Sequence, residues 1–291
     1  MSSTGFAAKR GRCPAPEIRL EVRAKRAIKG HREAALIDPF IAAAHMAADV
    51  AGAVIRPYFR AGLVSDLKSD ASPVTIADRS AELALRGVLA ERFPHHTVSG
   101  EEFPPHNPGQ RFRWVLDPVD GTRAFITGRP QFGTLIALLD DGVPILGVID
   151  QPITGERWLG AAGRPTEFRG AYGRAGCRPC PTLAEAELSA TSPQMFEADL
   201  PRWEHLVAQV KRRSFGGDCY AYGLLALGQI DIIAEATMKI WDWAALVPVI
   251  QGAGGSITDW SGAPLREDGD GRVLALGDPL LLPEALRALA A

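Results

Sequence analysis

The chain has 291 residues, of which 46% are hydrophobic and 23% charged, the composition of an ordinary globular protein. Its formal net charge of −2 leaves no global field that would attract nucleic acid or an anionic membrane, and no apolar run approaches the roughly 20 residues of a membrane span. Four cysteines are too few for a disulfide scaffold. Cys177 and Cys180 form a lone C-x-x-C without the partners of a zinc site, so we expect reduced thiols in a cytoplasmic protein.

Residues 1–33 differ from the rest of the chain, because they are rich in lysine and arginine and are interrupted by Pro14 and Pro16. They contain no apolar run of the kind that a secretory signal needs. We expect a disordered basic tail here, then an N-terminal sub-domain over residues 34–180 and a C-terminal sub-domain over residues 181–291. Glycine, arginine, proline and cysteine cluster at this predicted boundary.

Order is expected to begin at Asp38-Pro39, an N-cap residue followed by a proline that suits the first helical position. The polar stretch that follows this helix, residues 65–75, has the composition of a mobile loop. A second helix is predicted over residues 76–92 and strands over residues 97–160, with a hairpin turn at Asp141-Gly142. Beyond residue 182 helical and strand-like segments alternate.

The segment WVLDPVDGTRAF, residues 114–125, places two aspartates at the end of a predicted buried strand. Asp117 and Asp120 would repel each other there unless a positive charge lies between them. Asp, Pro and Gly also form turns, so a simple turn is the alternative for this segment. Gly121 and Thr122 would open a helix or turn whose backbone N–H groups face a phosphate.

Further carboxylates stand at the ends of predicted elements: Asp78 opens the second helix, Glu101 and Glu102 follow a strand, and Asp242 precedes an apolar helix expected to be long. Each has a structural alternative, namely a capping box with Thr75, a solvated loop and a plain N-cap. Together they form an oxygen-rich set of the kind that hard divalent cations bind.

Asp117 would bridge two cations in such a set, with Asp120 and Asp242 completing one site and Glu101 the other. Two ions about 4 Å apart stabilise the attacking and leaving oxygens of an in-line displacement. The cations would then supply the positive charge that the paired aspartates lack.

Four blocks of the sequence occur in order: DASPVTIAD at 70–78, GEE at 100–102, DPVDGT at 117–122 and WDWAA at 241–245. Together they resemble the signature blocks of the inositol monophosphatase family of lithium-sensitive, magnesium-dependent phosphatases, and the order and spacing hold over most of the chain. The resemblance implies a layered αβαβα sandwich of the α+β class and, in most members, a homodimer. It also implies two or three Mg²⁺ ions per active site, with Mn²⁺ as an accepted substitute.

The resemblance also implies a role for individual residues. Its metal ligands are Glu101, Asp117, Asp120, Asp242 and the Val119 carbonyl, its phosphate contacts are Asp120, Gly121 and Thr122, and its mobile loop carries Lys68 and Asp70. Thr122, hydrogen-bonded to Asp78, would orient and help deprotonate the nucleophilic water, with Glu101 as a further catalytic carboxylate.

The segment SFGGDCYAYGLLALG, residues 214–228, corresponds to the region of this family that contacts the alcohol half of the substrate. Asp218 introduces a carboxylate where many inositol-type members have a small neutral residue, and the segment resembles the histidinol-phosphate phosphatase branch. An added anion suits a substrate with an ammonium group. The alternative for Asp218 is a helix cap. Further substrate contacts implied by the resemblance are Gly216, Gly217 and Glu235.

The sequence therefore predicts a magnesium-dependent phosphomonoesterase that hydrolyses L-histidinol phosphate to L-histidinol and phosphate in histidine biosynthesis. The alternative within this class is an inositol monophosphatase or a broad-specificity sugar-phosphate or nucleotide phosphatase. A non-catalytic relative that only binds a partner is disfavoured by the intact ligand set. We expect a small phosphorylated molecule as the partner, and neither nucleic acid nor a membrane.

Overall fold

The computed structural model describes residues 37–61, 66–67, 73–74 and 76–290. Phe40–Ala291 form one compact unit, and Met1–Pro39 form another, of which only residues 37–39 are described. The predicted tail at residues 1–33 and the loop residues Lys68 and Asp70 lie outside the described residues. The predicted division of the ordered chain at residue 180 stays a prediction.

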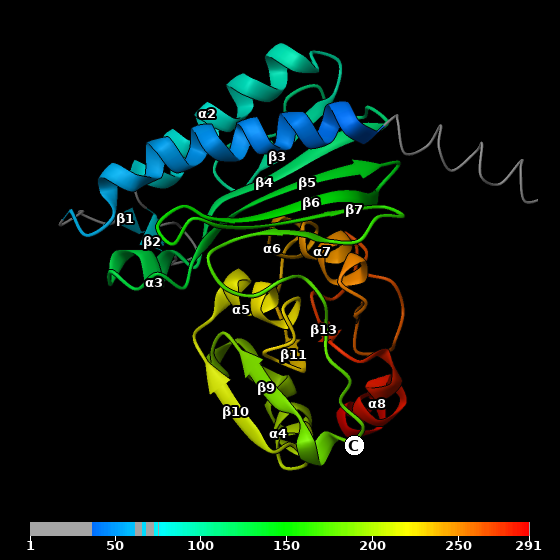
Figure 1. The fold of residues 1–291 in the computed structure, drawn as a ribbon. Helices are drawn as coiled ribbons and strands as arrows, with labels where there is room; N and C mark the ends of the chain where they lie inside the picture. Colours follow the sequence, from blue (N-terminus) through cyan, green and yellow to red (C-terminus); the bar gives the residue numbers. More distant parts are fainter. Residues whose placement is uncertain (1–36, 62–65, 68–72, 75, 291) are drawn as a thin grey trace, which may run out of the picture. The chain divides into compact units, whose positions relative to one another are not determined.

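Two sheets form the framework of the unit Phe40–Ala291 (Figure 1). The first has the strand order β3-β4-β5-β6-β7-β8, in which the β3–β4 pair is parallel and the others are antiparallel. Its strands are β3 (Thr97–Gly100), β4 (Phe112–Asp120), β5 (Gly133–Asp140), β6 (Val143–Gln151), β7 (Glu156–Ala161) and β8 (Glu167–Arg169).

The second sheet has the strand order β10-β9-β11-β13-β12, with parallel pairs on both sides of β9. Its strands are β9 (Glu187–Ala190), β10 (Arg212–Phe215), β11 (Ile232–Glu235), β12 (Ser256–Thr258) and β13 (Val273–Leu276). A separate short antiparallel pair consists of β1 (Asp66–Leu67) and β2 (Pro73–Val74).

Two predictions made from local sequence patterns are confirmed, one for a helix and one for a hairpin. The second helix occupies the predicted residues, and β5 and β6 are joined by the predicted hairpin, whose Asp141 and Gly142 both have positive φ, at 47° and 83°, as a two-residue type I′ turn needs. The α-helices are residues 37–55, α2 (Ile76–Arg92), α3 (Thr122–Ile126), α4 (Leu200–Val207), α5 (Asp218–Leu225), α6 (Ile240–Trp243), α7 (Leu246–Gly252) and α8 (Leu282–Ala290). The 3₁₀ helices are Arg56–Tyr58, Leu183–Glu185, Pro193–Met195, Glu197–Asp199 and Pro279–Leu281.

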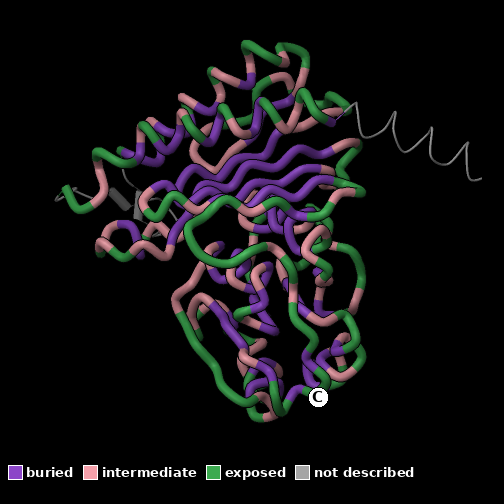
Figure 2. Tube along the Cα trace, viewed as in Figure 1, coloured by how far each residue is buried: buried purple, intermediate pink, exposed green. Residues whose placement is uncertain are grey.

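Within the unit Phe40–Ala291, the first helix, from residue 40 to 55, and α2 cover one face of the first sheet, whose strands are buried along most of their length (Figures 1 and 2). The first of these helices turns a face of fully buried alanines inward, which lets it lie close to the strands. These alanines are Ala43, Ala44, Ala47, Ala48 and Ala51. At one end, the ring of Phe40 packs on Phe112 and Trp114 of β4, with ring centroids 5.3 and 6.3 Å away.

The same helix, Ile37–Tyr58 with its last turn, has a mean hydropathy of 1.2 over a membrane-length window. It is therefore long and apolar enough to cross a bilayer, contrary to the expectation that no stretch approaches that length. A core helix passes the same test, and 39% of the window is buried. Asp49 of this helix accepts a hydrogen bond from Arg157 of β7 at 2.8 Å, which ties the helix to the first sheet.

A middle layer of helices, α5, α6 and α7, lies between the two sheets (Figure 1). Gly147 and Gly160 are cross-strand partners on β6 and β7, and they bring this layer into direct contact with the first sheet. A Cβ atom at Gly147 would lie 1.9 Å from the carbonyl oxygen of Ala245, and one at Gly160 would lie 2.2 Å from that of Pro248. Backbone atoms rather than side chains thus set the distance between the first sheet and the middle layer of helices.

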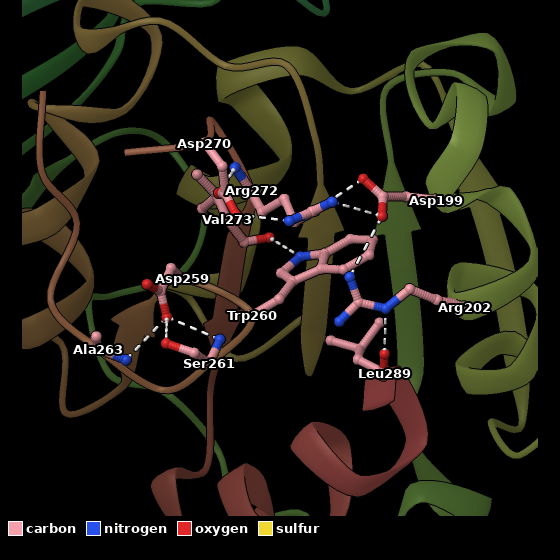
Figure 3. Close-up of polar contacts among 10 residues, drawn as sticks. All are labelled: Asp199, Arg202, Asp259, Trp260, Ser261, Ala263, Asp270, Arg272, Val273 and Leu289. Carbon is pink, nitrogen blue, oxygen red and sulfur yellow. Dashed lines mark hydrogen bonds and ion pairs between the residues drawn. The ribbon is translucent and has the colours of Figure 1, made fainter. Parts of the chain in front are cut away.

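The last layer consists of α4 and α8, which pack against the far face of the second sheet. An arginine pair holds it in place (Figure 3). Arg202 of α4 donates to the Leu289 carbonyl of α8 at 2.6 Å, Arg272 donates to both oxygens of Asp199 at 2.8 Å, and both guanidinium groups lie over the ring of Trp260. The order helix, sheet, helix, sheet, helix confirms the predicted αβαβα sandwich.

Candidate active site

A bulge at the end of β4 brings Asp117 and Asp120 to the same side of the strand. Residues three apart on a regular strand point to opposite faces. Here Asp117 pairs with Leu135 and Asp120 with Gly133, so three steps along β4 match two along β5. The extra residue restores a common face, and the Thr134 hydroxyl fixes the bulge by donating to the Pro118 carbonyl at 2.7 Å.

Asp242 joins these two aspartates from α6, and carboxylate oxygens of the three lie within 4.8 Å of one another. The Asp117 side chain is buried, and its Oδ1 has no hydrogen-bond partner among the described residues. Burial and then the charges of neighbouring carboxylates raise the pKa of Asp117 and of Asp120 well above the ordinary value. Burial also raises the pKa of Asp242 to about 7.

A divalent cation fits this cluster. Its donors are all oxygens, its central carboxylate has an unused buried lone pair, and its members repel one another unless a positive charge is added. A cavity of about 320 Å³ contains every residue predicted to ligate the metal or to bind phosphate. The lining is Glu101, Asp117, Val119, Asp120, Gly121, Thr122, Arg123, Thr191, Asp218 and Asp242.

The predicted helix start at Gly121-Thr122 is confirmed, because α3 begins at Thr122 with Gly121 as its N-cap. Gly121 has φ 85°, and a Cβ there would lie 3.0 Å from the Gln131 carbonyl oxygen, so only glycine suits the position. The Thr122 hydroxyl donates to the Val119 carbonyl at 3.1 Å. Its predicted hydrogen bond to Asp78 therefore stays a prediction. Asp78 is buried on α2 and close enough for its charge to raise the pKa of Asp117.

Three structural alternatives considered for these carboxylates are wrong. Asp242 is not an N-cap residue: Lys239 is, and Asp242 accepts the Lys239 N–H at 2.7 Å from the third helical position. Its helix is the short α6, followed by α7, rather than one long helix. Asp218 is not the N-cap residue of α5, because that residue is Gly217 and Asp218 is the first residue of the helix. Glu101 and Glu102 are half-buried rather than solvated.

A second cavity of about 170 Å³ adjoins the first and shares Asp120, Thr191, Asp218 and Asp242 with it. Its other lining residues are Met195, Cys219, Tyr222, Glu235, Ala236, Thr237 and Met238. Glu235, predicted to contact the substrate, is buried there at the end of β11, and burial raises its pKa. Its oxygens accept the Thr191 N–H at 2.6 Å and the Tyr222 hydroxyl at 2.8 Å.

Sequence reasoning missed Thr191 and Tyr222. Tyr222 lies one helical turn after Asp218, a spacing that places both side chains on one face of α5 and is visible in the sequence. No sequence pattern marked Thr191 as a site residue, because only the fold brings the end of β9 to this cavity. Gly216 and Gly217 lie outside the lining of both cavities, at the entry to α5.

Asp218 stands where the two cavities meet. A Cβ at Gly121 would lie 3.2 Å from its Cβ and Cγ atoms, so its side chain is packed against the start of α3. The next residue, Cys219, donates its N–H to Asp120 Oδ2 at 2.6 Å. Burial raises the pKa of Asp218 to about 6, opposed by hydrogen bonding from Thr191 and by the charges of Arg129 and Arg123.

Known proteins are similar to this chain over most of its length. Residues 36–290 match the model of the inositol monophosphatase family. The chain is 44% identical over 263 residues to "Bifunctional phosphatase IMPL2, chloroplastic" of Arabidopsis thaliana, covering 87% of this chain and 75% of that one. It is 37% identical over 237 residues to a histidinol-phosphatase of Chlorobaculum parvum, covering 78% and 88%. A solved inositol monophosphatase from Zymomonas mobilis is 47% identical with a TM-score of 0.80, covering 88% and 99%.

Proposed function

This chain belongs to the inositol monophosphatase family and is a phosphatase of that family, and on that premise we propose that it is magnesium-dependent and hydrolyses L-histidinol phosphate. The products would be L-histidinol and inorganic phosphate, a step of histidine biosynthesis. Homodimer formation and a cytoplasmic location stay predictions.

The metal would be held by Glu101, Asp117, Asp120, Asp242 and the Val119 carbonyl, which line one cavity. Bound Mg²⁺ supplies positive charge that neutralises the phosphate oxygens and acidifies water. Gly121 and Thr122, at the start of α3, would bind and orient the phosphate. In this proposal the Thr122 hydroxyl turns from Val119 to the attacking water, and Asp78 accepts the proton that the hydroxyl relays.

One observation carries the choice of substrate, namely the position of Asp218 between the metal cavity and the adjoining 170 Å³ cavity. A phosphate in the first cavity would place the alcohol half of its ester near this carboxylate. Histidinol phosphate carries an ammonium group on that half, and a charge-assisted hydrogen bond to Asp218 would be worth about 1.5–3 kcal/mol. A ring that bears only hydroxyls would offer no cationic group to Asp218.

The second cavity supports the same choice. Glu235 adds another carboxylate to its wall, so the cavity wall is acidic as well as partly apolar through Met195 and Met238. Such a lining suits a small cationic group joined to a flat ring. The similarity to histidinol-phosphatases points in the same direction.

The runner-up is hydrolysis of an inositol phosphate, favoured by the 47% identity to the inositol monophosphatase of Zymomonas mobilis. The two candidates differ in the alcohol half of the ester alone. Measuring kcat/KM at saturating Mg²⁺ separates the two candidates. The esters to compare are L-histidinol phosphate, myo-inositol 1-phosphate, β-glycerophosphate and a nucleoside 3′-phosphate. We expect histidinol phosphate to exceed the others by at least about 10-fold, since one charge-assisted contact is worth that much. A higher value for the inositol ester would overturn the substrate assignment.

A further inference from the structure

A buried ion pair on α2 lies directly behind the loop that carries Glu101. The Glu82 side chain is completely buried, and its Oε1 accepts a hydrogen bond from Nε of Arg86, one helical turn away, at 2.7 Å. Carboxylates are rarely buried to this degree unless they are paired. The spacing of this pair is that of an ordinary solvent-exposed helix pair, yet here it faces inward.

Both members of the pair also bind the main chain of that loop. Glu82 Oε2 accepts the N–H of Glu102 at 2.8 Å. Arg86 donates to the Phe103 carbonyl at 2.8 Å and to the Val98 carbonyl at 3.3 Å. These contacts hold the backbone before and after Glu101, so the loop has little freedom to shift its carboxylate.

Gly100 shows how closely the loop is seated on the pair. It immediately precedes Glu101, and a Cβ at this position would lie 2.4 Å from Cδ and Oε1 of Glu82. Any side chain here would push the loop off the carboxylate. The backbone of residue 100 therefore rests directly against Glu82.

The same face of α2 carries Asp78. Residues 78, 82 and 86 are spaced by four, which places them in one row along the helix. Asp78 is buried and its charge acts on Asp117, whereas the following two turns hold the Glu101 loop. The single helix α2 thus carries Asp78 and also positions the loop of Glu101.

We propose that Glu82 and Arg86 are positioning residues that fix the Glu101 carboxylate relative to Asp117 and thereby set the affinity of the site for its divalent cation. The inference rests on the proposed function, because it takes Glu101 as a metal ligand. Residues that orient a ligand from behind typically change metal affinity by about 10- to 100-fold when they are replaced.

Glu82→Gln tests the pair with almost no change of shape. One acceptor oxygen becomes an NH₂ donor, which then faces either Arg86 Nε–H or the Glu102 N–H, so one contact must be lost. Arg86→Lys is the milder variant, because a single ammonium replaces a fork that makes three separate contacts. It keeps the test possible if Glu82→Gln does not fold.

Asp150→Asn is a matched control. Asp150 is likewise buried and accepts from an arginine, Arg157, at 2.6 Å, but that pair contacts Asp49 of the first helix and lines neither cavity of the site. The two substitutions therefore remove the same kind of ion pair, but only the pair of Glu82 is bonded to the loop that carries Glu101.

Mg²⁺ is titrated by calorimetry into the metal-free full-length wild type, Glu82→Gln, Arg86→Lys and Asp150→Asn. Hydrogen exchange at the amides of residues 100–103 is followed in the same metal-free samples. We expect Kd for Mg²⁺ to rise about 10- to 100-fold in Glu82→Gln and less in Arg86→Lys, with faster exchange at the loop. Asp150→Asn should lower the melting temperature and leave Kd within about 2-fold.

Unchanged Kd in both α2 variants would overturn the inference while leaving the proposed function intact. An equal rise of Kd in Asp150→Asn would also overturn it, because the effect would then be a general loss of stability. A wild type that binds no Mg²⁺ would instead overturn the proposed function, and the inference with it.

Discussion

At Asp199, in the last helical layer, two arginines meet one carboxylate, whereas Asp117 lies among carboxylates and forms no ion pair within the described residues. Arg272 and Arg202 both donate to Asp199, and the hydrogen bond from Arg272 is the main reason that the pKa of Asp199 is lowered (Figure 3). Burial and like charges raise the pKa of Asp117. Two acidic groups of one fold are thus shifted in opposite directions.

The difference is that the Asp199 carboxylate has cationic partners within the fold. Among the described residues, no lysine or arginine forms an ion pair with Asp117, Asp120 or Asp242. The charge of that cluster is therefore not balanced by an ion pair within this part of the chain. We expect carboxylates of the cluster to lower the stability of the metal-free protein, and Asp199 to raise it.

The largest expected effect is that of Asp117→Asn. A metal contributes several kcal/mol of transition-state stabilisation, so kcat should fall by several powers of ten. The melting temperature of the metal-free protein should stay equal or rise, because a buried charge among like charges is removed. Activity assays and thermal unfolding, each with Mg²⁺ and with a chelator, check both expectations. Full activity of chelator-treated wild type would contradict the metal requirement.

Thr122 and Asp78 should act as one unit on the attacking water. General-base assistance is typically worth about 10² to 10⁴ in rate, so Thr122→Ala and Asp78→Ala should each fall in that range. The double variant should be little worse than either single one. Thr122→Ser keeps the hydroxyl and serves as the control. Losses that multiply in the double variant would show that the two residues act separately.

Asp218→Asn should change selectivity more than general activity. The carboxylate would lose its charge-assisted contact with a substrate ammonium, which corresponds to about a 10- to 100-fold lower kcat/KM for histidinol phosphate. Hydrolysis of a neutral ester such as β-glycerophosphate should change far less. An equal loss on both substrates would mean that Asp218 supports the fold or the metal cluster instead.

The smallest effect is expected at the arginine pair of the last layer. Asp199→Asn should lower the free energy of unfolding by about 1–2 kcal/mol at neutral pH, with kcat unchanged. Since the folded pKa of Asp199 is lowered, this advantage of the wild type is fully present above the unfolded value near 4. It disappears as the pH falls through the folded pKa. Urea unfolding at several pH values checks this, and a pH-independent difference would contradict it.

Much of the fold followed from local patterns in the sequence. The bounds of α2 and the turn at Asp141-Gly142 were predicted correctly, because capping, helical periodicity and turn chemistry act over a few residues. The αβαβα layering came from the resemblance of the signature blocks to a family. No local pattern contained it, since the sheets join strands that are far apart in the chain.

The candidate site was predicted as a set of residues, but not as a geometry. Alternation along a strand would separate Asp117 from Asp120, and only the bulge against β5 reunites them. The contact of Glu235 with Tyr222 joins a strand to a helix. The ion pair of Glu82 and Arg86 has the spacing of an ordinary surface pair, and its burial is not visible in that spacing. Each of these depends on tertiary contacts, which local sequence patterns do not encode.

The glycines at the centre of the first sheet bear on how this enzyme tolerates change. A Cβ at Gly147 would lie 1.9 Å from the Ala245 carbonyl oxygen, and Ala245 follows Asp242 by three residues. Gly147→Ala would therefore displace the segment that delivers Asp242, although Gly147 belongs to no cavity described above. Because the obstruction is backbone, no second substitution nearby could make room for it. A natural variant at Gly147 would therefore be expected to lose metal binding. We expect this position in the middle of a sheet to tolerate substitution as poorly as the catalytic residues do.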